Sequence, residues 1–204
     1  KIYQDESDDP EKIHIKLLIL RRGGISETAF RKMISECTIS NPSIKLSVEC
    51  IQKKHFTEES HKMEAPGQFL RHYAPNLPSY MLSSEPLVEE ETSSLQLSSC
   101  VFLDFNAQNI ALKDKVSLYL DLSERGDYIE AINNVYDYLR ISETQEKGEM
   151  VIIANLVDAK SVDLDNDSTH SEHSSALFDR LFRAVTGQAI KVDEAFTKYV
   201  ITKI

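Results

Sequence analysis

The chain has 204 residues, enough for one sizeable core or for one domain with appendages. Its 33 acidic residues outnumber the 23 basic ones, and the net charge of −10 argues against a broad electrostatic surface for nucleic acid. Three widely spaced cysteines without a C-x-x-C pair argue against a disulfide framework or a zinc site. No stretch has the length of a membrane span. We therefore expect a cytoplasmic protein and assign no metal site.

The first fifty residues alternate between polar and short apolar segments. Four elements are predicted there: a polar loop over 1–12, a buried strand over Ile13–Leu20, a helix that Ser26 caps, and a short strand over Leu46–Ile51. Arg21 follows the first strand directly, so its guanidinium either faces a phosphate or forms a structural ion pair.

The segment Ala65–Pro75 is the most specific feature of the chain. It places Arg71, His72 and Tyr73 side by side between two prolines, without apolar periodicity. Because proline stiffens the chain in an extended form, this pattern suits capture of an anionic ligand better than core packing. The alternative is that these side chains brace an interface between domains.

A stretch rich in serine and glutamate follows at 83–99, and we expect a mobile surface loop. The pattern beyond it alternates between strands and helices. Strands are predicted over Val101–Phe105, Val116–Leu120 and Met150–Val157. A helix follows Asp127, which forms a capping box with Glu130, and a last helix starts at Ser174 or Ser175 and ends at Gly187.

This alternation predicts an α/β fold: a Rossmann-like, three-layer domain with a mostly parallel sheet and helices on its faces. Asp104 and Asp121 end two of its strands, where active sites of such sheets lie, so an independent small enzyme is one alternative. No nucleophile–base pair accompanies them, and no glycine-rich phosphate loop exists. We assign no catalytic residue.

Two weaker patterns resemble metal sites, but we assign a metal to neither. The acidic run at 163–167 opens like a calcium loop but lacks the turn glycine and the final glutamate. His170 and His173 lie three residues apart in a polar segment, and we expect them to be exposed bystanders.

The segment Ala65–Pro75 resembles the interdomain linker of the long, two-domain threonylcarbamoyl-AMP synthases, which typically reads (S/A)-P-G-M-K-Y-R-H-Y-A-P. Eight of the eleven positions match, and Gln68, Phe69 and Leu70 differ. Three further segments resemble the same family in the same order. They are the strand end Leu17–Ile25, the region Leu120–Asp127 with the helix end Tyr136–Arg140, and the helix Ala176–Ala184.

The resemblance implies a part in tRNA modification at adenosine 37. The family joins L-threonine, bicarbonate and ATP into threonylcarbamoyl-AMP and pyrophosphate, and its linker closes over the active site. In that setting Arg71 would bind a phosphate or carboxylate, Tyr73 would donate a hydrogen bond, and His72 would donate or orient. Arg21 would face nucleotide phosphate. Pro66, Gly67 and Pro75 would shape the linker.

The family's K-x-R and S-x-N motifs, which hold ATP and substrate, are absent before Leu17. The resemblance therefore implies three parts: the end of a catalytic-type domain at 1–40, the linker at 41–80, and a C-terminal domain at 81–204. ATP, with Mg²⁺, would be held mainly by the missing catalytic domain, and this chain alone would bind no cofactor and be inactive.

The catalytic domain of the same protein is the first expected partner, and the tRNA threonylcarbamoyl transferase complex is a second. The negative charge disfavours direct tRNA binding, and we expect no membrane partner. The alternative function is a non-catalytic docking or regulatory module of the tRNA-modification machinery.

Overall fold

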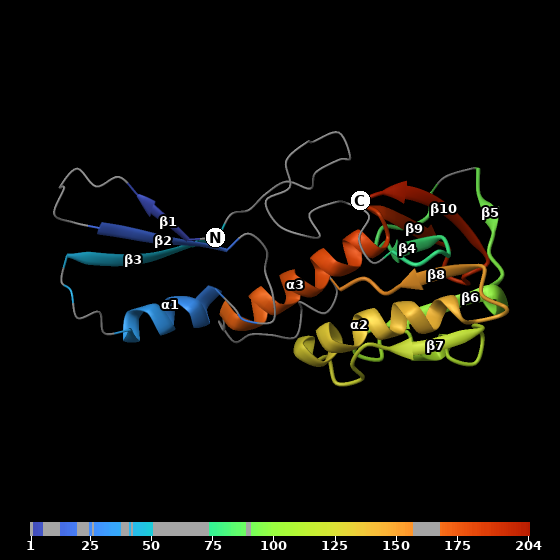
Figure 1. Ribbon diagram of the computed structural model, residues 1–204. Helices are drawn as coiled ribbons and strands as arrows, with labels where there is room; N and C mark the ends of the chain where they lie inside the picture. The colour runs from blue at the N-terminus through green and yellow to red at the C-terminus, as the bar shows by residue number, and fades with distance from the viewer. Residues whose placement is uncertain are drawn as a thin grey trace.

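The chain forms two separate β-sheets, each with its own helices, in the computed structural model (Figure 1). The structure describes residues 2–5, 13–19, 25, 27–37, 41, 43–50, 74–88, 91–156 and 168–204, with side chains of the last range from residue 172. None of the described helices is both long enough and apolar enough to cross a membrane.

The smaller sheet and one helix make up what we call the N-terminal unit. It contains β1 (Ile2–Asp5), β2 (Ile13–Ile19), α1 (Glu27–Glu36) and β3 (Ile44–Cys50). β2 lies in the middle, parallel to β3 and antiparallel to β1. The β2 strand, the helix and the β3 strand confirm the predicted elements, and Ser26, the predicted cap of the helix, lies outside the described residues. The prediction of a loop over all of 1–12 is wrong for Ile2–Asp5, because pairing with β2 makes this polar segment a strand.

The larger sheet has seven strands in the order β5-β10-β9-β4-β8-β6-β7. Its strands are β4 (Ser79–Leu82), β5 (Ser93–Ser94), β6 (Cys100–Asp104), β7 (Leu118–Asp121), β8 (Met150–Ile153), β9 (Gln188–Val192) and β10 (Lys198–Lys203). Parallel ladders join β9, β4, β8, β6 and β7, whereas β10 pairs antiparallel with both neighbours. The mostly parallel sheet is confirmed. We call residues 74–204 the larger domain.

The two helices of the larger domain, α2 (Tyr128–Glu143) and α3 (Ser168–Ala184), cover the same side of the sheet. Val135 and Leu139 of α2 and Leu177 and Leu181 of α3 share one apolar cluster with the sheet residue Val151. This burial is the main stabilising contribution of the helices, since apolar surface leaves water.

The opposite side of the sheet carries a second apolar cluster around Phe102, Ile152 and Ile190. Two short turns of 3₁₀ helix, η1 (Leu97–Ser99) and η2 (Ile110–Leu112), contribute Leu97 and Leu112 to it. Tyr119 from β7 and Tyr199 from β10, near opposite edges, both pack against it. The sheet therefore curls around this side, as strand twist allows.

These features leave the Rossmann-like, three-layer prediction unconfirmed within the described parts of the chain. Both long helices of the larger domain share one face. The strand order also differs, because β8 lies between β4 and β6, whereas the doubly wound order keeps its first two strands adjacent. The division of the chain at residues 40 and 80 stays a prediction.

Two local expectations need correction. α3 begins at Ser168, earlier than Ser174 or Ser175. The serine- and glutamate-rich stretch is held to the sheet at its far end, where β5 pairs with β10 and Leu95 is 6% exposed. The strands β9 and β10 were not predicted, and each completes a ladder of the sheet.

Candidate functional site

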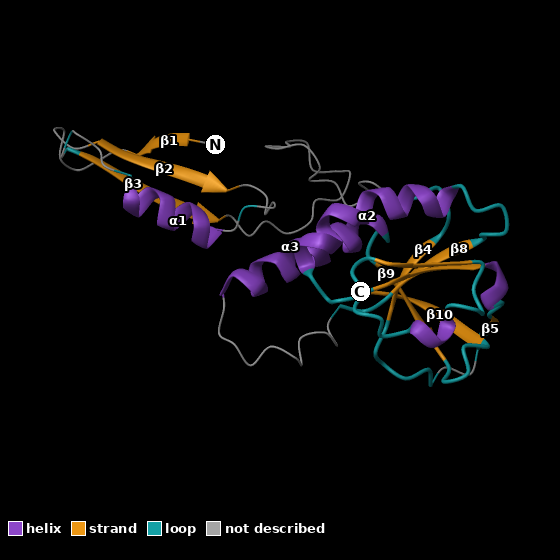
Figure 2. Cartoon of the chain, turned by 90° about the horizontal axis from the view of Figure 1, so that it is seen from below, coloured by secondary structure: helices purple, strands orange, loops and turns teal. Residues whose placement is uncertain are grey.

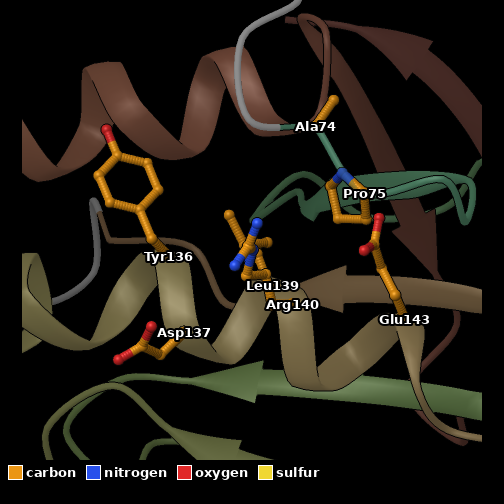
Figure 3. A pocket seen from close by; sticks show the side chains of 7 residues that line it. All are labelled: Ala74, Pro75, Tyr136, Asp137, Leu139, Arg140 and Glu143. Carbon is orange, nitrogen blue, oxygen red and sulfur yellow. The ribbon is translucent and has the colours of Figure 1, made fainter.

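The end of the predicted linker lies on α2 and forms a surface hollow with it. The hollow has a volume of about 370 Å³, and we call it the linker pocket (Figure 3). It is lined by Ala74, Pro75, Tyr136, Asp137, Leu139, Arg140 and Glu143. The first two residues end the linker motif, and most of the others belong to the helix end that resembles the same family. Two segments with independent family resemblance therefore meet here.

The hydrogen bonds at its start orient α2. The Asp127 carboxylate accepts hydrogen bonds from the backbone N–H groups of Ile129 and Glu130, at 2.8 and 3.1 Å, which confirms the predicted cap. Ser123 links the two residues of the capping box. Its hydroxyl donates to Glu130 Oε2 at 2.6 Å and accepts from the Asp127 N–H at 3.0 Å. Glu130 thus reaches the backbone of Asp127 through Ser123.

The floor of the linker pocket is apolar and its rim is charged. Leu139 is 3% exposed and Pro75 is buried, so these two side chains join the linker end to the core. The backbone N–H of Asn76 donates to Glu143 Oε1 at 2.7 Å. Figure 3 shows the Glu143 carboxylate beside the Pro75 ring and Tyr136 at the other end of the hollow. The linker end is therefore fixed by one burial contact and one charge-assisted hydrogen bond.

Charges of both signs surround the hollow. Arg140 supplies a cation, while Asp137 and Glu143 supply carboxylates, and all three residues are exposed. Within the described residues no group of three or more His, Cys, Asp or Glu side chains could hold a metal ion.

A second polar cluster lies at the carboxyl ends of β6 and β7. Asp104 is fully buried and accepts hydrogen bonds from the Asn109 N–H at 2.7 Å, from Asn109 Nδ2 at 2.9 Å and from the Tyr119 hydroxyl at 2.5 Å. The pKa of Tyr119 is raised, first because burial disfavours the phenolate and then because Asp104 binds its proton.

Asp121 is paired with Asp104 across the two strands. It accepts from the N–H groups of Ala107 at 2.8 Å and Ser123 at 2.9 Å. Burial raises the pKa of Asp121, and the two backbone donors oppose that rise. The backbone φ is positive at Asn106 and Ala107, so this turn needs its hydrogen bonds. Both carboxylates thus accept hydrogen bonds from the turn that follows their strands.

The other predicted site residues fall outside the described residues. These are Arg21, Pro66, Gly67, Arg71, His72 and Tyr73, and their roles stay predictions. Of all the predicted site residues the structure describes Pro75 alone, and it is buried against α2. Sequence reasoning missed Glu143 and Tyr119, since each acts through a partner distant in sequence.

Of the two predicted exposed histidines, His170 and His173, the structure describes the side chain of His173. His173 is buried at 9% exposure, so the expectation of an exposed bystander is wrong for it, because the helix begins earlier than predicted. Its Nδ1 atom has no hydrogen-bond partner in the part of the chain that the structure describes. The side chain of His170 and the acidic run at 163–167 lie outside that part.

Comparison with known proteins yields one family. The family described as threonylcarbamoyl-AMP synthase, C-terminal domain, matches residues 30–186. This range includes the linker motif, the linker pocket and both helices of the larger domain. No curated protein and no solved structure shows significant similarity to the chain. Since the matched range covers most of the sequence, this chain belongs to the family of threonylcarbamoyl-AMP synthase C-terminal domains.

Proposed function

We propose that this chain is the linker-bearing C-terminal module of a threonylcarbamoyl-AMP synthase. The complete enzyme would convert L-threonine, bicarbonate and ATP into threonylcarbamoyl-AMP and pyrophosphate for tRNA modification. The observation that carries the proposal is the attachment of the linker end, Ala74 and Pro75, to α2. The family match is its second support.

The attachment limits where the linker can act. Three peptide units separate Arg71 from Ala74, so their Cα atoms lie at most about 11 Å apart even in a fully extended chain. His72 and Tyr73 are closer still. The reactive centre that these side chains serve is therefore expected next to the linker pocket, with the larger domain acting as the fixed body from which the linker closes.

The chemistry of these side chains fits a closing segment. A guanidinium recognises phosphate or carboxylate through paired hydrogen bonds, and closure excludes water from a reactive carbamate. In this proposal Arg71 binds an anionic group, His72 and Tyr73 donate hydrogen bonds, and Arg21 faces nucleotide phosphate. ATP and Mg²⁺ are bound mainly by the catalytic domain, which is the principal partner.

The test is pyrophosphate release from ATP in the presence of L-threonine and bicarbonate. The catalytic domain of a family member is fused ahead of residue 1 and compared with the same fusion truncated after residue 50. The complete fusion is expected to be active and the truncated one nearly inactive. Arg71→Ala is expected to lower activity as well.

A matched pair of variants tests the attachment itself. Glu143→Ala removes the acceptor of the Asn76 N–H and is expected to lower activity by about two- to tenfold, because a hydrogen bond at this exposed site contributes about 0.5–1.5 kcal/mol. Glu146→Ala removes an exposed carboxylate that does not line the linker pocket, and it is the control. Equal activity of the complete and truncated fusions would overturn the proposal and favour a docking module.

A further inference from the structure

The first turn of α1 is capped by a residue from the far end of the chain. The Glu172 side chain, on α3, accepts hydrogen bonds from the Thr28 N–H at 3.1 Å and from Thr28 Oγ1 at 2.7 Å. Its other oxygen accepts from the backbone N–H of Glu27. Figures 1 and 2 both show the start of α3 next to the start of α1. We call this set of contacts the Glu172 latch.

A capping group normally comes from the residue just before the helix. The first N–H groups of a helix have no partner inside it, and the helix dipole adds partial positive charge there. A carboxylate at this position satisfies both the donors and the charge. Here the carboxylate belongs to a different structural unit, so its contacts with the first turn of α1 also hold the N-terminal unit against α3.

The charges around the latch favour this arrangement. Glu27, the first residue of α1, has a carboxylate that would repel Glu172, but its Oε1 atom accepts from Arg31 Nε at 2.8 Å and Nη2 at 2.5 Å. The adjacent Arg31 guanidinium therefore offsets that charge. Glu172 is held by a rigid support, because the following turns of α3 place Leu177 and Leu181 in the core at 0% exposure.

We propose that Glu172 is a positioning residue that fixes the N-terminal unit on the larger domain through the first turn of α1. The consequence concerns the linker. Along the chain, the start of the linker motif lies between β3 in the N-terminal unit and Ala74 on α2. With the latch formed, Cys50 at the end of β3 and Ala74 on α2 belong to one body. The inference concerns the position of the unit and does not depend on the proposed activity.

The first measurement is the distance distribution between two spin labels on the full chain. One label is placed on Cys37, which is exposed, and the other on Lys147→Cys, in the exposed turn after α2. Cys50 is replaced by Ser, and Cys100 is fully buried and stays unlabelled. The parent chain is expected to give one narrow distribution. Glu172→Ala is expected to at least double its width.

Further variants separate the latch from general damage. Glu172→Gln keeps one acceptor oxygen and is expected to give an intermediate width, and Thr28→Val, which keeps the N–H, is expected to do the same. Glu146→Ala is the control and leaves the distribution unchanged. If circular dichroism shows that Glu172→Ala does not fold, the widths of the distance distributions of Glu172→Gln and Thr28→Val test the inference instead.

Hydrogen exchange of the segment 27–37 provides a second readout. Loss of a helix cap is expected to speed its exchange by about 2- to 30-fold in Glu172→Ala, the range measured for N-cap removal. A distance distribution that stays as narrow as in the parent chain would overturn the inference, even with faster exchange, since Glu172 would then cap α1 without positioning the unit. A broad distribution in the parent chain would overturn it as well.

Discussion

The substitution Tyr119→Phe tests whether Asp104 stabilises the fold. It removes one hydroxyl group from the cluster of Asp104, Asn109 and Tyr119 at the carboxyl ends of β6 and β7. Tyr119→Phe deletes the donor that lies 2.5 Å from Asp104 Oδ2. The ring itself remains, and so does its stacking on Phe102, where the centroids are 6.3 Å apart and the planes differ by 5°. The substitution therefore isolates one hydrogen bond from the packing around it.

The expected loss follows from the charge and burial of the acceptor. Asp104 is 0% exposed, and after the substitution only Asn109 donates to it among the hydrogen bonds described above. A hydrogen bond to a charged group contributes about 1.5–3 kcal/mol to the free energy of unfolding. For a chain of this size each kcal/mol corresponds to about 2–4 °C, so the unfolding midpoint is expected to fall by about 3–12 °C.

The assay is urea unfolding followed by circular dichroism at pH 7, with a thermal scan beside it. Tyr138→Phe, at a half-buried tyrosine on α2, is the control and is expected to change the free energy of unfolding by less than about 0.5 kcal/mol. Because the pKa of Tyr119 is raised, its hydrogen bond contributes fully below the ordinary tyrosine value of 10.0 and declines as the pH rises above it. Equal stability of Tyr119→Phe and the parent chain at pH 7 would refute the reasoning.

Two further predictions concern the turn before α2. Gly126 has a φ of +72°, and a Cβ atom there would lie 2.9 Å from Asn106 Oδ1. Gly126→Ala is therefore expected to lower the free energy of unfolding by about 1–2 kcal/mol. Urea unfolding measures this change, and an unchanged free energy would contradict the prediction. The Ser123 hydroxyl, and after it Arg125, lower the pKa of Glu130 below its ordinary 4.5. Its stabilising contribution is thus full above pH 4.5 and lost as the pH falls through the lowered pKa, so the stability of the parent chain should decline more steeply in acid than that of Glu130→Gln. Parallel urea midpoints of the two proteins from pH 6 to pH 3 would argue against this coupling.

The two segments that form the candidate site could be identified from the sequence, but their contact could not. The linker motif and the helix end Tyr136–Arg140 each resemble one family, and their resemblance is visible without a structure. Their meeting is a property of the fold, because Asn76 and Glu143 are 67 positions apart. Glu143 has no local signal that separates it from neighbouring acidic residues such as Glu146. Only the chain path over α2 distinguishes them.

The fold, like the site, could be predicted from the sequence only in part. The strands β6 and β8 and the cap of α2 follow from apolar runs and from side chains that act within a few positions of the helix start. The strand β1 is short and half polar, and it becomes a strand by pairing with β2. Strand propensity is weak relative to pairing, so such segments are decided by tertiary context.

The sequence by itself determined the alternation of strands and helices, the start of α2 and the family resemblance of the linker, because each depends on residues close together along the chain. The tertiary structure alone decided the one-sided placement of α2 and α3, the attachment of Pro75, the buried cluster of Asp104 and Tyr119, and the capping of α1 by Glu172. The last of these joins residues 144 positions apart. Such contacts form only when the packing of the sheets brings distant donors and acceptors together, and no local pattern encodes that meeting.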